Sequence, residues 1–367
     1  MKVLISGAGV AGPVLAHWLR RGGFTPTIVE RSPVPRVGGQ AIDVRGTALQ
    51  VVERMGVLDD IRAAATNMRG MSFVDDDGAE LFRSEEETLT GGVIGSPDVE
   101  VLRDDLSAIL LRGKEDCIAY GDRIVALDEH EHGVRVTFGS GKEEEFDLVV
   151  GADGLHSAVR ALAFGQESEY LHHLGAYLSV FTTPNFLDLD HWQVFHRTEG
   201  RMSGVYSARG NTEARSMLGF ESEPLDFDHR DVAGQQVLIA ERYEGVGWET
   251  KRLLELMRAA PDFYFDSMSQ VKMDRWHRGR VALVGDAAYC GSPLSGQSTS
   301  TAIVGAYVLA AELTAARGDH RTAFPRYQDV LWDYVARNQA LATDTPGEPA
   351  SHERMAEVAN SLDLPSC

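Results

Sequence analysis

The sequence is poor in cysteine, and this excludes folds that depend on sulfur cross-links. Cys117, Cys290 and Cys367 are the three cysteines of a 367-residue chain, and they lie far apart. An odd, scattered set predicts neither a disulfide framework nor a cysteine-ligated metal site. Since nothing in this set calls for an oxidising compartment, we expect a cytoplasmic protein.

Long apolar runs and positive charge are scarce as well. No segment reaches the roughly 20 apolar residues that cross a bilayer. Glycines interrupt the apolar start of the chain, which therefore does not fit a signal peptide. Lys and Arg number 35 against 55 Asp and Glu, which gives a net charge of −20. Because basic patches drive binding to nucleic acids and anionic lipids, we expect neither a nucleic acid nor a membrane as a partner.

What the chain does contain is the composition of a globular protein. Hydrophobic residues make up 43% and charged residues 25% of the sequence, which are ordinary values for a folded domain. The length allows about two domains with ample core. Short apolar runs that end in glycine alternate with helical patterns, which predicts an α/β fold. The sequence leaves monomer and homodimer open.

The amino-terminal segment contains a glycine-rich turn between a strand and a helix. An apolar run, Lys2–Ser6, leads into Gly7, Gly9 and Gly12, and the next predicted strand ends at Glu30. This order is the fingerprint of a dinucleotide site, in which Gly7 permits the turn, Gly9 admits a pyrophosphate and Gly12 lets helix pack on strand. Glu30 would bind the adenosine ribose and repel a 2′-phosphate, so FAD or NAD is expected rather than NADP. The alternative is a glycine-rich turn without a ligand.

A second strand and turn lie in the segment Gly279–Leu309. Val281–Val284 is a short apolar run, and small residues then lead to Gly296, where a long helical pattern begins. Unpaired N–H groups at the start of that helix make an anion site, and Asp286 can accept hydrogen bonds from hydroxyls. A polyol and an anionic ring are features of a flavin. The alternative is an ordinary strand, loop and helix of an α/β core.

Other elements are predicted between these two motifs. Arg31–Gly46 is a Pro- and Gly-rich loop, which is typical both of functional loops and of solvated surface. Two helical patterns follow, and then a β-hairpin over Met68–Arg83 with an Asp-Gly turn. Val99–Leu111 is predicted to be one amphipathic helix with Arg103 near its start.

A third strand that ends in glycine and aspartate leads to Asp153 and Gly154. A short helix from Ser157 follows and contains Arg160. His130-Glu131-His132 lies in a turn and is a poor metal site, so we predict no metal. Strands are expected at Cys117–Tyr120, Ile124–Glu131, Val134–Phe138 and Phe146–Val150.

The segment Glu167–Met273 has a different texture, with short alternating stretches and many aromatic residues. The alternation predicts a mixed or antiparallel sheet. The aromatic side chains fit a hydrophobic core, and together they also fit a sheet face that covers a flat apolar substrate. Strands are expected at Ala176–Thr182, Trp192–Arg197, Met202–Ala208 and Arg215–Phe220, helices or extended connections at Val232–Ala240, Glu249–Ala259 and Asp262–Asp266, and a helix at His320–Ala342 before a linker and short terminal helix in Thr343–Cys367.

Taken together, the motifs resemble a known family, the single-component FAD-dependent (class A) aromatic hydroxylases typified by para-hydroxybenzoate hydroxylase. The match rests on G-x-G-x-x-G at Gly7–Gly12, DGLHSAVR at Asp153–Arg160, GDAA at Gly285–Ala288 and P-x-x-G-Q at Pro293–Gln297. LRDDLSAILL and GGQAIDVRG are similar to segments of the tetracycline-inactivating and polyketide-tailoring branch. The resemblance covers Met1 to about Leu313, and the joint match is specific although each motif alone is modest.

The resemblance implies a Rossmann-type, GR2-like FAD-binding domain interleaved with a mixed β-sheet substrate domain and followed by a C-terminal helix. The FAD-binding domain would comprise residues 1–67, 97–166 and 274–318. The substrate domain would comprise residues 68–96 and 167–273. Residues 319–367 would form the C-terminal helix and tail.

The resemblance also implies roles for individual residues. Asp286 would bond the ribityl chain, Glu30 the adenosine ribose, and Arg103 the FAD phosphate or ribityl region. Asp153 and Arg160 belong to a motif shared by FAD and NAD(P)H contacts. The expected cofactor contacts are Gly7, Gly9, Ala11, Gly12, Glu30, Arg31, Arg36, Asp43, Arg45, Arg103, Asp153, Arg160, Gly285, Asp286, Pro293, Gly296, Gln297 and Ser298.

Two positions depart from the family pattern. Tyr289 stands where the family usually has histidine, and Ser298 replaces the second glycine of G-Q-G. A Cβ at position 298 narrows the allowed backbone conformations, so flavin placement could differ. Tyr289 and Gln297 are weak candidates for a catalytic side chain, and no general base is identified.

The implied activity is hydroxylation of an aromatic or polycyclic, polyketide-like molecule such as a phenol, in antibiotic biosynthesis or modification. NADPH or NADH would reduce FAD, and O₂ would give a C4a-hydroperoxyflavin that passes oxygen to the substrate. One alternative is an FAD-dependent reductase or oxidase of a bulky apolar substrate. Another is a protein that binds FAD or a ligand without catalysis. A flavin-dependent halogenase is disfavoured because no W-x-W-x-I-P stretch is present.

Overall fold

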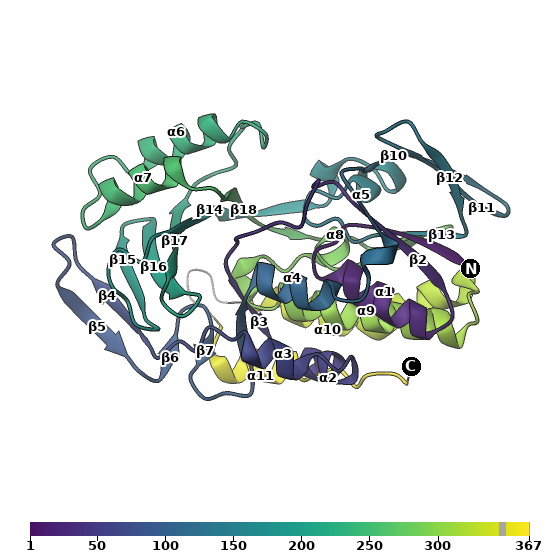
Figure 1. Ribbon diagram of the computed structural model, residues 1–367, viewed down its shortest axis with the longest axis horizontal. Coiled ribbons are helices and arrows are strands. Elements are labelled where there is room, and N and C mark those ends of the chain that lie inside the picture. The colour runs from purple at the N-terminus through teal and green to yellow at the C-terminus, as the bar shows by residue number, and fades with distance from the viewer. Residues whose placement is uncertain (345–349, 367) are drawn as a thin grey trace.

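The computed structural model describes residues 1–344 and 350–366, and two large sheets with their packed helices make up most of it (Figure 1). The first sheet has six strands in the order β19-β20-β13-β1-β2-β9. All its neighbours are parallel except the edge pair β19 and β20. The strands are β1 (Lys2–Ser6), β2 (Thr25–Glu30), β9 (Ile118–Tyr120), β13 (Leu148–Gly151), β19 (His277–Arg278) and β20 (Val281–Leu283).

Helices pack against this sheet, and a small three-stranded sheet contacts its strands β1 and β13. The helix α9 (Ser298–Ala315) contacts both α1 (Ala11–Arg21) and α10 (His320–Ala340). It carries apolar and small residues on all sides, as a helix enclosed by neighbours requires. The small sheet is β10 (Ile124–His130), β11 (Gly133–Phe138) and β12 (Glu143–Phe146), and the other helices of this part are α2 (Thr47–Arg54), α3 (Leu58–Ala63), α4 (Arg103–Leu111), α5 (Ala158–Ala163) and α8 (Asp286–Tyr289).

The second sheet has seven strands in the order β18-β14-β17-β16-β15-β4-β5, and β14 and β18 extend from it towards the first sheet (Figure 1). Its neighbours are antiparallel except β15 and β4. The strands are β4 (Met71–Val74), β5 (Glu80–Ser84), β14 (Leu171–Thr183), β15 (Gln193–Thr198), β16 (Arg201–Ala208), β17 (Glu213–Glu221) and β18 (Phe263–Val271).

The two faces of the second sheet pack against different partners, because successive side chains of a strand point to opposite faces. Phe181 and Phe220 point to α6 (Val232–Arg242) and α7 (Thr250–Ala259) and form one core with them. Leu178, Tyr206 and Met217 belong to a separate cluster on the other face. That face meets the start of β3 (Ala41–Val44), where the Ala41 N–H donates to the Tyr206 hydroxyl at 2.9 Å.

Most predicted elements are confirmed, and the prediction for Val99–Leu111 was wrong. This segment is a strand, β8 (Val99–Leu102), followed by α4. Val99 and Val101 are β-branched and alternate with a polar residue, and β8 pairs antiparallel with β3. The apolar spacing of the segment matched a helix, but its strand partner lies about sixty residues earlier in the chain, beyond the reach of a local pattern.

One further expectation was wrong, and one open alternative is decided. The strand expected over Phe146–Val150 is divided at Asp147, between the end of β12 and the start of β13. Asp262–Asp266, left open between helix and extended chain, is extended, and Phe263–Asp266 form the start of β18. The short strands β6 (Glu87–Thr88) and β7 (Gly92–Val93) were not predicted.

The carboxy-terminal region contains the expected long helix α10 and a short helix, α11 (His352–Ala359). Residues 345–349 of the expected linker lie outside the described residues. In the part of the chain that the structure describes, no helix combines the length and apolarity that crossing a membrane requires. The proposed domain boundaries stay a prediction.

Candidate functional site

Three of the motif loops leave the first sheet at the same edge. The strands β1, β13 and β20 are adjacent and parallel. Gly7 follows β1, Asp153 follows β13, and Gly285 follows β20. The loops at the carboxyl ends of parallel strands form the ligand crevice of open α/β sheets. The three motif loops therefore converge at one edge of the sheet.

The glycines of the amino-terminal turn are required at their positions for different physical reasons. At Gly7 (φ +107°) an added Cβ would lie 2.4 Å from the Ala152 carbonyl oxygen, and at Gly12 it would lie 2.0 Å from the Gly7 oxygen. At Gly9 an added Cβ would meet no atom of the described residues within 4 Å. Gly7 and Gly12 are thus required by backbone packing, whereas Gly9 faces open space where a ligand can approach.

Glu30 lies at the end of β2 beside this turn. One carboxylate oxygen accepts the Ala8 N–H at 2.9 Å, and the other accepts the Ser32 N–H at 2.8 Å. The guanidinium of Arg36 is 3.8 Å away, and Arg31 and Arg36 are both exposed. Glu30 therefore holds the glycine turn in place, and its contact with a ribose stays a prediction.

Arg103 begins α4 and is partly buried against Gly39, where an added Cβ would lie 2.7 Å from the Arg103 Nε. Burial, together with the neighbouring Arg36 cation, lowers the pKa of Arg103. Within the described residues its guanidinium has no ion pair. A partly buried cation without a carboxylate partner suits a phosphate or another anion.

Asp43 and Arg45 lie where β3 ends and form an ion pair of 2.8 Å. Arg45 is also 3.5 Å from Asp98. Burial raises the pKa of Asp43 to about 7, although Arg45 opposes this shift. The Arg45 N–H donates to the Ser300 hydroxyl at 3.0 Å, and that hydroxyl donates to the Asp43 carbonyl. These bonds fix the end of β3 against the first turns of α9.

Asp286 and Gln297 are polar side chains of the segment that joins β20 to α9. Asp286 is half-buried; desolvation raises the pKa of its carboxyl, and the nearby Cys290 thiol opposes this shift. Gln297 is fully buried, and within the described residues neither of its amide atoms has a hydrogen-bond partner. Since leaving a buried polar group unpaired costs about 1–3 kcal/mol, the Gln297 amide calls for a polar ligand.

Two glycines shape the segment that joins β20 to α9. Gly285 (φ +66°) brings the start of α8 against Ala11, and Gly296 has the left-handed conformation (φ +63°). Pro293 begins a 3₁₀ turn. Ser298 is the first residue of α9 and has no positive φ, and its hydroxyl accepts the Gly291 N–H at 3.2 Å. The serine is therefore accommodated without backbone strain.

Asp153 and Arg160 bond to the protein itself. The Asp153 carboxylate accepts from the hydroxyls of Ser157 and Ser6. Arg160 is fully buried and donates to the Ala287 carbonyl at 3.0 Å and to Glu167 at 2.9 Å. Both side chains fix the loop after β13, and their contact with a nucleotide stays a prediction.

The surroundings of Tyr289 speak against a catalytic role. Its ring lies in the core, 4.7 Å between centroids from Trp276, and its hydroxyl is 3.1 Å from the Tyr327 hydroxyl of α10. Burial raises its pKa to about 12. An added Cβ at Gly305 of α9 would overlap the Tyr289 hydroxyl. The phenol thus fills a space between α8, α9 and α10.

Sequence reasoning missed two polar contributions. Ser300 was not singled out. A small hydroxyl residue in the first turn of a helix is a usable signal for a hydrogen bond to a neighbouring segment, which here is the end of β3. His156 was quoted within DGLHSAVR without a role, and it contacts both Glu167 and Asp266. No local signal links His156 to Asp266, because 110 residues separate them.

Comparison with known proteins identifies the family. Residues 1–324 match the family model described as FAD binding domain. A flavin-dependent monooxygenase of Legionella longbeachae serogroup 1 (strain NSW150) is 42% identical over 382 residues, which cover 100% of this chain and 98% of that protein. The chain belongs to the FAD-dependent monooxygenases. Its cofactor is FAD.

Two further comparisons extend over the whole length of this monooxygenase. The uncharacterized protein Rv1260 of Mycobacterium tuberculosis (strain ATCC 25618 / H37Rv) is 51% identical over 366 residues, which cover 99% of this chain and 98% of that one. The crystal structure of tetracycline destructase Tet(51) is similar with a TM-score of 0.91 at 36% identity, covering 100% of this chain and 99% of that chain.

The residues of the monooxygenase site fit FAD. The open space at Gly9 leaves room for a pyrophosphate, and Arg103 supplies an unpaired cation. The buried amide of Gln297, unpaired within the described residues, and the half-buried carboxylate of Asp286 can pair with the polar groups of a flavin and its ribityl chain. These groups all belong to segments that meet at one edge of the parallel sheet or pack against it.

Proposed function

We propose that this monooxygenase hydroxylates a flat polycyclic substrate of the phenol or enol type, like those of polyketide metabolism, with O₂ and either NADPH or NADH. The observation that carries the proposal is the likeness to tetracycline destructase Tet(51), which extends over the entire chain. Its name assigns that protein a polycyclic substrate. Because a shared fold alone does not fix a substrate, the proposal also rests on the residues of the site itself.

The second sheet supports this substrate class. Leu178, Met217 and Tyr206 lie on the face that meets the start of β3, away from the core formed with α6 and α7. Arg215 of β17 donates to the Gly39 carbonyl at 3.0 Å, which brings the same sheet close to Arg103. A mostly apolar face with few polar groups suits a flat aromatic molecule.

A bound FAD supplies the electron transfer and the activation of O₂. The chain has to bind it, orient it and exclude water. Gly9 leaves room for the pyrophosphate, and Asp286 and Gln297 would orient the flavin end. The amides at the start of α9 would stabilise negative charge on a ring placed beside them.

The structure makes the alternative of an FAD- or ligand-binding protein without catalysis less favoured than it was from the sequence alone. That alternative depended on Tyr289 and Ser298, and both side chains have packing or hydrogen-bonding roles that leave the site intact. A reductase or oxidase of a bulky apolar substrate differs from a hydroxylase in its product.

Cys117 and Cys290 are buried free thiols, which agrees with the reducing cytoplasmic location that we propose.

The decisive experiment is a screen of polycyclic phenols with the FAD-loaded protein. NADPH and NADH consumption is measured with and without each compound, and product masses are recorded under labelled O₂. We expect stimulated consumption and a product that has gained one labelled oxygen atom. A product that has only lost hydrogen would replace hydroxylation with dehydrogenation, and no stimulation by any compound would count against the substrate class.

A further inference from the structure

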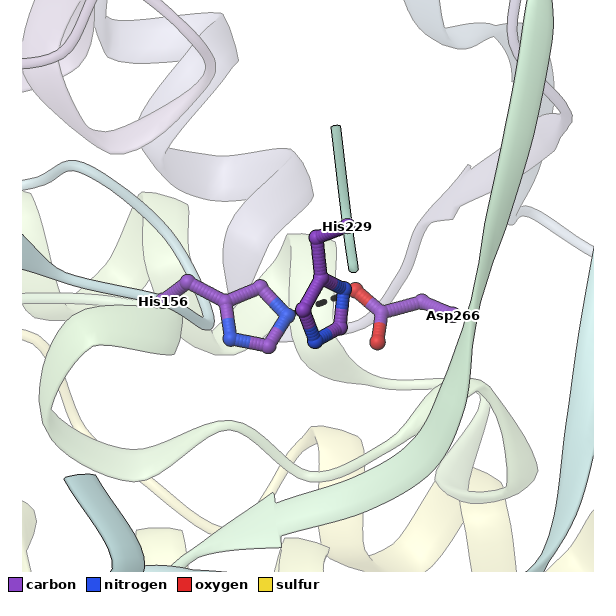
Figure 2. Close-up of side chains that lie close together, drawn as sticks. All are labelled: His156, His229 and Asp266. Atoms are coloured by element: carbon purple, nitrogen blue, oxygen red, sulfur yellow. Dashed lines mark hydrogen bonds and ion pairs between the residues drawn. The ribbon is translucent and has the colours of Figure 1, made fainter. Parts of the chain in front are cut away.

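Two histidines and a carboxylate from distant segments meet beside the loop after β13 (Figure 2). His156 lies in that loop, His229 lies in the loop before α6, and Asp266 lies on β18. One ligand atom from each residue lies within 4.8 Å of the others. The two imidazole rings are 4.5 Å apart between centroids. We propose that these three side chains bind one divalent transition-metal ion, for which Zn²⁺ is the probe.

The donor set selects the class of metal. Two imidazole nitrogens and one carboxylate oxygen suit Zn²⁺, Co²⁺ or Ni²⁺, whereas Mg²⁺ and Ca²⁺ prefer oxygen ligands. Metal–ligand bonds of about 2.0–2.2 Å place tetrahedral donor atoms about 3.3 Å apart. His156 Nε2 and Asp266 Oδ2 are 2.8 Å apart. The donor atom of His229 lies within 4.8 Å of these two atoms. An opening of about half an ångström between His156 and Asp266, with rotation of the exposed His229 towards them, would therefore give tetrahedral donor spacing.

A second layer of hydrogen bonds holds two of the ligands. The other nitrogen of His156, Nδ1, is 2.9 Å from Glu167, and Glu167 is held in turn by Arg160 at 2.9 Å. The second oxygen of Asp266 accepts the Ser267 N–H at 2.8 Å. Carboxylate–histidine–metal arrangements of this kind fix the ring orientation and leave the opposite nitrogen for the ion.

The site is accessible, and occupation would have a mechanical consequence. His156 and His229 are exposed, so an ion can enter and a water molecule can complete the coordination. An ion there would connect the loop after β13 with β18 of the second sheet. It would thereby join the FAD-binding part of the chain to the sheet proposed to cover the substrate. The sequence predicted no metal, because ligands 73 and 37 residues apart form no recognisable spacing motif.

The test is calorimetric titration of ZnCl₂ into the untagged, chelator-treated, FAD-loaded protein. We expect one Zn²⁺ per chain. His229→Gln should weaken binding by more than about 100-fold, since it removes a ligand, and Glu167→Gln by roughly 10- to 100-fold, since it removes only the orienting bond. His172→Gln is the matched control, because His172 is exposed on β14 outside the cluster, and it should bind like the parent.

Two results would overturn the proposal. One is parent affinity no tighter than that of His229→Gln, and the other is an equal loss in His172→Gln, which would indicate general surface binding. Glu167 contacts His156 and Arg160, so Glu167→Gln is interpreted only when its thermal melt matches that of the parent. His229 lies in an exposed loop, so its variant decides the question without that condition. The result is independent of which substrate the monooxygenase oxidises.

Discussion

The parallel sheet and the seven-stranded sheet present their functional surfaces in different ways. In the parallel sheet, backbone geometry forms the proposed cofactor site. Gly7 and Gly12 allow backbone contacts that a Cβ would block, and Gly9 leaves space for a ligand. In the seven-stranded sheet, side chains form the functional surface, because Leu178 and Met217 are core residues on the face that is proposed to meet the substrate. Cofactor binding should therefore be sensitive to single methyl groups, and substrate choice to the identity of larger side chains.

The sharpest test of this comparison sets two glycines of one motif against each other. Gly12→Val places side-chain atoms against the Gly7 carbonyl, so we expect loss of soluble folded protein. At Gly9 an added Cβ meets no described atom within 4 Å, so Gly9→Val should fold normally but lose nearly all bound FAD, because the side chain occupies the space proposed for the pyrophosphate. Circular dichroism and thermal melts measure folding, and the flavin absorbance of the purified protein measures binding.

Gly23→Val serves as a control for general effects of valine at a glycine with open surroundings away from the site. Its φ of +83° predicts a modest loss of stability with full flavin content. Full flavin content in Gly9→Val would show that the open space at this turn is not where the nucleotide lies.

Asp286→Ala should remove most of the bound FAD while the fold remains. The Asp286 side chain is half-buried and lies beside the Cys290 thiol, so its removal leaves the apolar core nearly unchanged. A flavin that depends on this acceptor loses a charge-assisted bond, worth roughly 1.5–3 kcal/mol or about 10- to 150-fold in affinity. Asp286→Asn keeps an acceptor oxygen and should retain more FAD. Equal flavin titration curves for Asp286→Ala and the parent would contradict the assigned role.

The sequence predicted local geometry well and side-chain destinations poorly. The three strand-and-turn motifs are read from neighbouring residues, and adjacency of their strands in one sheet follows from the parallel α/β pattern. Tyr289 shows the limit. Its place in the GDAA segment suggested the site, yet the direction of its ring is set by Gly305 and Tyr327, which lie in helices further along the chain.

The same limit explains the errors in the fold and the missed network. Val99–Leu102 is a strand because β3 supplies a partner, which no helix-period pattern within the segment can reveal. His156 and Asp266 meet because β18 pairs with β14, which brings the end of the second sheet back to the first. Contacts of this kind depend on topology and not on spacing.

Phe220→Ala tests the second sheet by stability. Phe220 is buried between Tyr177 and Phe265, with ring centroids at 5.6 and 6.1 Å, in the core shared with α6 and α7. We expect a loss of about 3–5 kcal/mol in the free energy of unfolding, with unchanged FAD per folded molecule. Val237→Ala, at an exposed position of α6, should change stability by no more than about 0.5 kcal/mol. Flavin loss with intact stability would break the separation between the two sheets.

The smallest expected effect concerns pH and the charge on Asp43. Burial raises the folded-state pKa of this carboxyl from 3.8 to about 7. A carboxyl with a raised pKa favours the folded state at low pH, and this contribution is lost as the pH rises from about 4 through about 7. Asp43→Asn removes the dependence, so its melting temperature relative to the parent should increase between pH 5 and pH 8. Loss of the Arg45 partner removes the charge that opposes this shift, so the pKa of Asp43 should rise further and the loss of stability should extend to higher pH.

Asp122 provides the opposite sign for comparison. Weak burial opposes the shift, but hydrogen bonds from the Ser140 hydroxyl and from backbone N–H groups lower the pKa of Asp122. Asp122→Asn should therefore show its largest deficit above pH 4 and approach the parent as the pH falls below it. If thermal melts give the two variants the same slope, the Asp43 carboxyl is ionised throughout this range, and Arg45 outweighs burial at the end of β3.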